Sequence, residues 1–162
     1  MWQSITDKIN TWEEADNQII AWKNKGQKIV FTNGCFDLVH YGHLHYLAAA
    51  RALGDKLVIG LNSTASVKRL KGMHRPINDD LTRQYLLASL QCVDLVVVFE
   101  EDTPLKLIQL LSPAILVKGG DWKMEQIVGS DWVLSNGGSV QSLPFMNGYS
   151  TTNIEAKILS NR

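Results

Sequence analysis

Residues 28–46 limit how the chain can fold more than any other stretch, because an apolar run, a glycine turn and a helix start follow one another directly. The run Ile29-Val30-Phe31 is typical of a buried parallel strand. The turn Asn33–Asp37 comes next, and an amphipathic segment begins near His40. Free backbone N–H groups and the positive end of a helix dipole meet at such a joint. The stretch therefore predicts a phosphate-binding site.

Two histidines stand at the predicted helix start. His40 and His43 are three residues apart, so both lie on one side of the first turn and both can donate hydrogen bonds to a single polyanion. Gly42 between them removes a side chain that would keep a ligand from the backbone. A single histidine here would be interpreted as a cap or a surface residue. A metal site is the weaker interpretation, because no third ligand cluster is evident.

Length and composition indicate a globular protein. The 162 residues are 45% hydrophobic, which predicts one domain, 1–162, with an N-terminal helix in 1–26 and the core in 28–162. Lys plus Arg and Asp plus Glu number 16 each, with no basic run, which argues against nucleic acid or a membrane surface as a partner. No apolar stretch reaches the length of a signal or a membrane span, so we expect a cytoplasmic location.

The two cysteines are expected to be free thiols. Cys35 and Cys92 are far apart and flanked by apolar residues, which is typical of buried thiols in a reducing compartment. Cys35 lies in the predicted phosphate turn, but no neighbour in the sequence is a dedicated base. A nucleophilic role for it is therefore not favoured.

Helical and strand patterns alternate along the chain. Apolar runs predict strands at 29–31, 56–61, 94–99, 114–117 and 139–143. We expect a capped helix after Thr11, a basic loop at 67–72, a helix capped by Asn78 and a helix capped by Thr103 with proline following. This alternation predicts a three-layer α/β domain with a parallel sheet of five strands.

Two later segments resemble ligand-binding joints. Lys118–Asp121 follows the fourth predicted strand, and Gly148–Thr152 brings consecutive hydroxyls to the start of the last helix, where a second phosphate could bind. GxGxxG does not follow the first strand, and GxxxxGK[ST] is absent from the sequence. A dinucleotide oxidoreductase and a P-loop kinase therefore lose their main support.

Taken together, these motifs resemble a known family. Residues 34–43 (GCFDLVHYGH) resemble the GxFDxxHxGH signature of the cytidylyltransferase-like nucleotidyltransferases, and 148–152 (GYSTT) looks like their GxSTT signature. The likeness extends over nearly all of the chain from about Lys28. The segments that are similar to the heptose 1-phosphate adenylyltransferase branch are 67–72 (VKRLKG), 75–78 (RPIN), 99–104 (FEEDTP), 117–121 (VKGGD) and 150–154 (STTNI).

The resemblance implies a Rossmann-like fold and a specific reaction. In this branch AMP passes from ATP to D-glycero-β-D-manno-heptose 1-phosphate, pyrophosphate leaves, and the ADP-heptose serves lipopolysaccharide inner-core assembly. A separate kinase would supply the substrate. Mg²⁺ is expected to be carried by the ATP phosphates, with Asp37 helping through water. Relatives tend to be homodimers or larger, and Trp2, Trp12 and Trp22 could serve an interface or simply the core.

The resemblance also implies the site residues. The expected catalytic residues are His40, His43, Lys71 and Thr151. The expected nucleotide-binding residues are Thr32, Asn33, Gly34, Cys35, Phe36, Asp37, Gly42, Lys68, Arg83, Lys118, Gly119, Asp121, Ser150 and Thr152. The histidines would face the α- and β-phosphates, Ser150–Thr152 the β- and γ-phosphates, and Lys71 or else Lys68 the α-phosphate or the sugar phosphate. Arg83 would reach the triphosphate and Asp121 the nucleoside, and no protein ligand for a metal is expected.

Two alternatives remain open at this stage. Glycerol 3-phosphate cytidylyltransferases are similar, but they carry an arginine shortly before GxSTT, where this chain has 144–147 (PFMN), and an acid where it has Gly120. Both differences favour the heptose branch over CTP. A nucleotide-binding regulatory protein without turnover is the other alternative, and the intact His40, His43 and Ser150–Thr152 argue against it.

Overall fold

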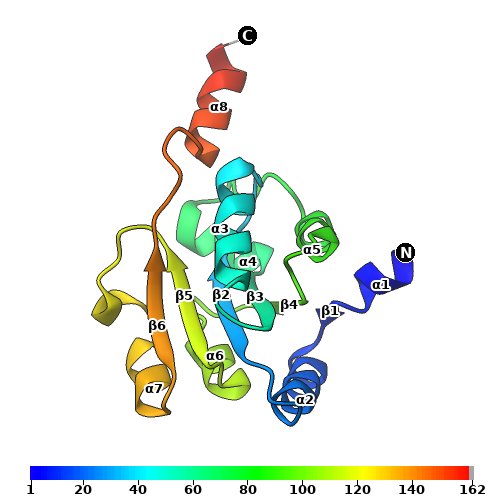
Figure 1. Ribbon diagram of the computed structural model, residues 1–162. Helices are drawn as coiled ribbons and strands as arrows, with labels where there is room; N and C mark the ends of the chain where they lie inside the picture. The colour runs from blue at the N-terminus through cyan, green and yellow to red at the C-terminus, as the bar shows by residue number, and fades with distance from the viewer. Residues whose placement is uncertain (161–162) are drawn as a thin grey trace.

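The computed structural model describes residues 1–160, in which six parallel strands form one sheet flanked by helices (Figure 1). The strands are β1 (Ile9–Asn10), β2 (Ile29–Gly34), β3 (Lys56–Asn62), β4 (Leu95–Phe99), β5 (Ile115–Gly119) and β6 (Ser139–Leu143). The helices are α1 (Trp2–Thr6), α2 (Trp12–Lys23), α3 (Tyr41–Arg51), α4 (Thr64–Lys71), α5 (Asp80–Ser89), α6 (Leu105–Leu111), α7 (Ser130–Ser135) and α8 (Thr151–Ser160), with a 3₁₀ turn η1 (Met124–Gln126). The predicted three-layer α/β class is confirmed.

The predicted number of strands was wrong by one. The sheet order is β1-β4-β3-β2-β5-β6, and the additional strand β1 pairs in parallel with β4 at the edge. Only Ile9 and Asn10 belong to it, which is too short for an apolar period to be visible in the sequence. The short edge strand is held by the backbone, since the Val96 N–H donates to the Lys8 carbonyl.

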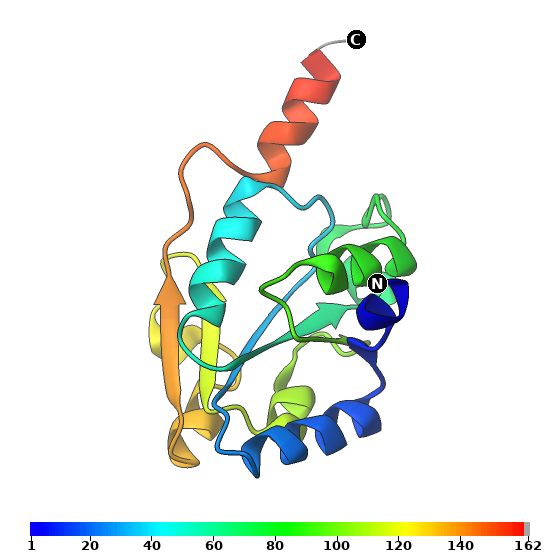
Figure 2. The ribbon, with the colours of Figure 1, turned by 45° about the vertical axis from the view of Figure 1, so that its right-hand side comes forward.

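The strands are buried on both faces, so their residues alternate between two cores. On one face Phe31 packs with residues of α2, α6 and α7, among them Ile19 and Leu107. On the other face Val30 packs with residues of α3 and α5, among them Leu47 and Leu87. Figure 2 shows the sheet running between these two helical layers.

The helix caps explain where several helices begin. The predicted capping box of Thr11 is confirmed, since the Glu14 N–H donates to the Thr11 hydroxyl and Glu14 accepts from the Thr11 N–H. Asp79 rather than Asn78 caps α5, because its carboxylate accepts from the Thr82 N–H. Likewise Pro104, not Thr103, is the residue that precedes α6.

The basic segment predicted as a loop is helical. Residues 64–71 form α4, which Ser63 caps by accepting from the Ser66 N–H. Ser66 is fully buried, but its hydroxyl donates to the Glu101 carbonyl and accepts from the Asn62 amide. A buried, hydrogen-bonded serine occupies a core-facing position here, which concealed the helical period in the sequence.

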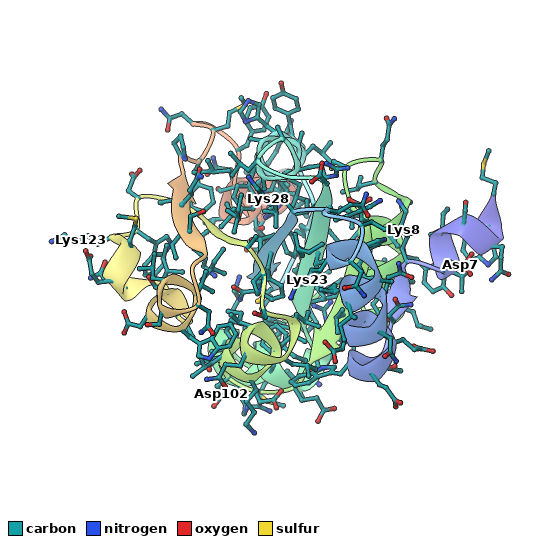
Figure 3. All side chains as sticks on the ribbon, turned by 60° about the horizontal axis from the view of Figure 1, so that its bottom comes forward. Asp7, Lys8, Lys23, Lys28, Asp102 and Lys123 are labelled. Carbon is teal, nitrogen blue, oxygen red and sulfur yellow. The ribbon has the colours of Figure 1, made fainter. Side chains whose placement is uncertain are left out.

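The three N-terminal tryptophans have different surroundings. Trp12 and Trp22 belong to α2 and pack against the core. The Trp12 indole N–H donates to the Val98 carbonyl. Trp2 stacks on Tyr85 at 5.0 Å between ring centroids and stays largely exposed. Lys23, at the end of α2, donates to the Leu111 carbonyl and is labelled at the amino-terminal end of the sheet in Figure 3.

The sheet order creates a switch point at β2. From β2 the chain proceeds through β3 and β4 on one side, and then crosses to β5 and β6 on the other. In open parallel sheets, a crevice forms outside the carboxyl ends of the strands where the order reverses. The β2 end and the β5 end are therefore the expected place for a ligand. Among the helices of residues 1–160, none has the length and apolar character that a membrane span requires.

The core beneath the carboxyl edge of the sheet leaves no room for a side chain at Gly60 on β3. A Cβ at Gly60 would lie 2.7 Å from the Phe31 Cζ. We expect Gly60→Ala to lower the free energy of unfolding by about 1–3 kcal/mol through overpacking. Urea denaturation of Gly60→Ala, Phe31→Leu and the double variant measures this. The double variant should lose less than the sum of the single losses, and strict additivity would contradict the clash.

Candidate active site

Two adjoining cavities open at the carboxyl end of the sheet, with volumes of about 160 and 390 Å³. The smaller is lined by Asn33, Gly34, Cys35, Phe36, Asp37, His43, Tyr46, Lys71, Lys118, Gly119, Phe145 and Thr151. The larger is lined by His40, Gly42, His43, Tyr46, Phe145, Met146, Asn147, Gly148, Tyr149, Ser150, Thr151 and Asn153. Four of these residues line both cavities, so the two lie side by side, and we refer to them together as the cleft.

The turn after β2 forms the floor of the cleft. Phe36 has a φ of 44°, in the left-handed region that a bulky residue seldom adopts. Its ring lies over Gly34, where a Cβ would be 3.0 Å from the ring, and it tilts against His43 at 5.4 Å between centroids. Glycine at position 34 therefore makes room for the Phe36 ring, since a side chain there would collide with it.

The carboxylate of Asp37 is buried and saturated with hydrogen bonds. Its Oδ1 accepts from the N–H groups of Ile77 and Asn78, and its Oδ2 from the Arg75 guanidinium at 2.8 Å and again from Ile77. Burial alone would raise the pKa of Asp37, but these donors together hold it below its usual value. Asp37 thus anchors 75–78 to the turn, and its acceptor sites are filled where a metal-bound water was expected.

His40 and His43 stack at the start of α3. Their ring centroids are 3.9 Å apart, and the His40 N–H donates to the His43 Nδ1 at 3.4 Å. A Cβ on Gly42 would lie 3.1 Å from the His40 Nδ1 and 3.2 Å from the Tyr149 Cβ. Gly42 therefore makes room for the His40 ring and Tyr149, where we had expected room for a ligand. The His40 Nδ1 is buried and has no hydrogen-bond partner in residues 1–160.

Partial burial disfavours the charged form of both histidines. It lowers the pKa of His40, and burial with the charges of His40 and Lys71 lowers the pKa of His43 to about 4. A neutral imidazole carries one N–H donor. A polyanion in the cleft would offset the desolvation and favour the charged, doubly donating form.

Two lysines enter the smaller cavity from different elements. Lys118 on β5 donates to the Asn33 Oδ1 at 3.3 Å, and Lys71 ends α4. Burial, with a smaller contribution from Lys71, lowers the pKa of Lys118. Asp37 is the one acidic side chain lining the cavities in the described residues, and Arg75 pairs with it. The cleft therefore presents positive charge to an anion.

The start of α8 closes the cleft from the other side. The Ser150 hydroxyl accepts from the Asn153 N–H at 3.0 Å, which is the bonding of an N-cap. Thr151 lines both cavities, whereas Thr152 lines neither. Figure 1 shows the first turn of α8 next to the start of α3, so two helix N-termini meet at the same cleft.

Five of the expected residues do not line the cleft: Thr32, Lys68, Arg83, Asp121 and Thr152. Arg83 is buried, donates to the carbonyls of Cys35 and Asn62, and pairs with Asp80, so it supports the turn from behind. The Thr32 hydroxyl hydrogen-bonds that of Tyr46 at 2.6 Å. Burial raises the pKa of the Cys35 thiol, which agrees with a thiol that does not act as a nucleophile.

The cleft also contains residues that the sequence did not single out: Tyr46, Phe145, Met146, Asn147, Tyr149 and Asn153. Tyr46 could have been found, because it is one helical turn after His43 and faces the same side. Burial raises its pKa to about 12, so its hydroxyl stays protonated. The 145–149 segment carries no periodic signal, and only its position before the helix start brings it here.

Comparison with known proteins identifies the family of this chain. The sequence model of the Cytidylyltransferase-like family matches residues 31–157. The chain belongs to this family, and the match includes both signature segments and the strands between them.

Two relatives within this family are similar in sequence to most of the chain. The chain is 57% identical over 152 residues to the bifunctional protein HldE of Trichlorobacter lovleyi and 56% identical over 152 residues to that of Geobacter metallireducens. In both cases 94% of this chain is covered, and it spans 31% of the relative's length.

Two solved structures share the fold. A lipopolysaccharide core biosynthesis protein from Thermoplasma volcanium matches with a TM-score of 0.62 and 30% identity, covering 77% of this chain and all of that one. A pantoate-beta-alanine ligase from Francisella tularensis, at 17% identity and a TM-score of 0.61, covers 95% of this chain and 78% of that one, and shows the fold alone.

The half-buried, neutral His43 makes stability depend on pH. Its pKa is about 4 in the folded chain against an ordinary 6.5, so between these values the unfolded chain binds a proton that the folded chain does not. The free energy of unfolding should therefore fall as pH drops from 6.5 toward 4, with no contribution from His43 above this window. Urea midpoints at pH 7 and pH 5 should differ less in His43→Asn than in wild type. His45→Asn, on the exposed side of α3, is the control, and equal pH dependence in wild type and His43→Asn would contradict the prediction.

Proposed function

We propose that this protein transfers AMP from ATP to D-glycero-β-D-manno-heptose 1-phosphate, forming ADP-heptose and pyrophosphate. The observation that carries the proposal is the meeting of the His40–His43 pair, Lys71, Lys118 and the start of α8 around one cleft. The identity to the HldE proteins over 94% of this chain supports it, as do the segments typical of the heptose branch. The likeness to the lipopolysaccharide core biosynthesis protein of Thermoplasma volcanium supports a role in lipopolysaccharide core synthesis.

The chemistry needs positioning and charge stabilisation. The sugar phosphate oxygen attacks the α-phosphorus in line with the departing pyrophosphate, and no covalent enzyme intermediate forms. His40 and His43 donate to the α- and β-phosphates, and the α8 start with Thr151 holds the β- and γ-phosphates. Lys71 and Lys118, within the same cavity, offset the charge where the two phosphates approach each other.

ATP would bring Mg²⁺ on its phosphates. The residues of the cleft fit this arrangement. Asp37 is the one carboxylate that lines the cleft within residues 1–160, and its acceptor sites are filled by hydrogen bonds, so the phosphates would supply the oxygen ligands of the metal. The metal would neutralise phosphate charge and orient the pyrophosphate. Use of ATP and of a phosphorylated sugar also fits a cytoplasmic enzyme, and we expect a homo-oligomer.

Pyrophosphate release tests the donor, the acceptor and the histidines together. With Mg²⁺, we expect release from ATP but not CTP, and only when the β-heptose 1-phosphate is present. His40→Ala and His43→Ala should each lower kcat by about 10²–10³, because each removes a donor to the transition-state charge. His45→Ala is the matched control on the exposed face of α3. Release with CTP alone would indicate a cytidylyltransferase, and ATP binding without turnover would indicate a binding protein.

The two candidate lysines can be separated by substitution. Lys71 lines the cleft and Lys68, one turn earlier on α4, does not. We expect Lys71→Met to lower kcat/KM by about 10²-fold or more, since a charge-assisted contact to phosphate is lost. Lys68→Met should change it less than about threefold. Steady-state kinetics with both substrates measures this, and a larger loss in Lys68→Met would reverse the assignment.

A further inference from the structure

The first residue of helix α8, Thr151, lines the cleft, but the helix makes few packing contacts with the rest of the molecule. None of its residues is buried, and Ile158 and Leu159 are largely exposed. Figures 1 and 2 show it projecting from the rest of the molecule, with its first turn alone close to α3. Its entry segment contributes one aromatic contact, between Tyr149 and Tyr41 at 5.2 Å between centroids. Ordinary core packing therefore does not fix the position of Thr151.

One arginine links this helix to the turn after β2. The Arg75 Nη1 donates to the Asp37 carboxylate at 2.8 Å, and its Nη2 forms an ion pair with the Glu155 carboxylate in the second turn of α8. The Arg75 side chain is 18% exposed and the Glu155 side chain 33%, so both charges are largely withdrawn from water. Neither Arg75 nor Glu155 lines the cleft.

We propose that Arg75 is a positioning residue, which sets the phosphate-binding end of α8 against the turn of the first signature by bridging Asp37 and Glu155. The effect that we expect on the KM for ATP rests on the proposed function, whereas the effect on the position of α8 does not. Asp37 stands at the end of the β2 turn, and Glu155 is one helical turn beyond Thr151 on α8. A single guanidinium therefore fixes the separation of the two helix starts that form the cleft.

The chemistry of the bridge favours arginine. A guanidinium presents donors in a rigid planar fork, so it can bind two carboxylates in different directions at once. The Asp37 end is itself held by the N–H groups of Ile77 and Asn78. The fixed end is therefore the turn, and the end that can be released is α8. A lysine would offer one point charge and could not hold both carboxylates in this geometry.

Glu155 allows the bridge to be opened without disturbing the turn. Glu155→Gln removes the charge and keeps the size and helix propensity. Lys157→Gln is the matched control, because it changes one charge on the same helix and Lys157 forms no ion pair within residues 1–160. The first measurement is hydrogen–deuterium exchange of the nucleotide-free chain. We expect exchange in 151–160 to become several-fold faster in Glu155→Gln only, while α3 stays unchanged.

Kinetics provides the second measurement. Glu155→Gln should raise the KM for ATP about tenfold with kcat changed less than about threefold, because the α8 end holds phosphates in both ground and transition states. Glu155→Asp should restore part of the loss. In a cycle with Arg75→Lys, the two changes should be non-additive, since they break one ion pair.

The outcomes separate this inference from the proposed function. Unchanged exchange in Glu155→Gln, equal effects of Glu155→Gln and Lys157→Gln, or faster exchange with an unchanged KM would each overturn the positioning role. If wild type turns over no nucleotide, the proposed function fails. The exchange experiment then still decides whether the bridge fixes α8.

Discussion

The cleft depends on the hydrogen bonds to the buried carboxylate of Asp37. Backbone N–H groups of Ile77 and Asn78 and the guanidinium of Arg75 converge on it, and the Asn78 amide donates to the Asp37 carbonyl. Burying a carboxylate is unfavourable unless its acceptor sites are filled. Any arrangement in which Asp37 stays buried without these donors would therefore be less stable. It fixes the turn after β2, the segment before α5 and, through Arg75, the approach to α8.

The cleft gathers positive charge that the fold alone would not favour. His43, Lys118 and Lys71 line the same cavity. Burial, with a smaller contribution from the charge of Lys71, lowers the pKa of both His43 and Lys118. Groups held below their ordinary pKa are characteristic of sites that bind the opposite charge. An anion entering the cleft would favour the charged forms of His43 and Lys118, so the protein would take up protons on binding it.

The sequence predicted what is local and missed what is assembled at a distance. The β2 turn, the His40–His43 pair and Thr151 were found because strand, glycine and cap signals stand next to each other. Phe145 was missed, since it reaches the cleft only through the path of the chain after β6. Tyr46 was missed although its helical spacing from His43 was visible. Edge strand β1 was too short to show a period, and α4 was concealed by its buried serine.

Arg83 shows why residue type alone does not assign a role. The family resemblance implied that Arg83 reaches the triphosphate, yet its guanidinium donates to the Asn62 carbonyl at the end of β3 and to the Cys35 carbonyl just after β2. A parallel sheet leaves such carbonyls unpaired at its carboxyl edge, and burying them without donors would be unfavourable. Arg83 supplies those donors from α5. Arg75 likewise supplies donors to the carboxylates of Asp37 and Glu155. Neither arginine lines the cleft, so both stabilise its walls, while the histidines and lysines line its interior.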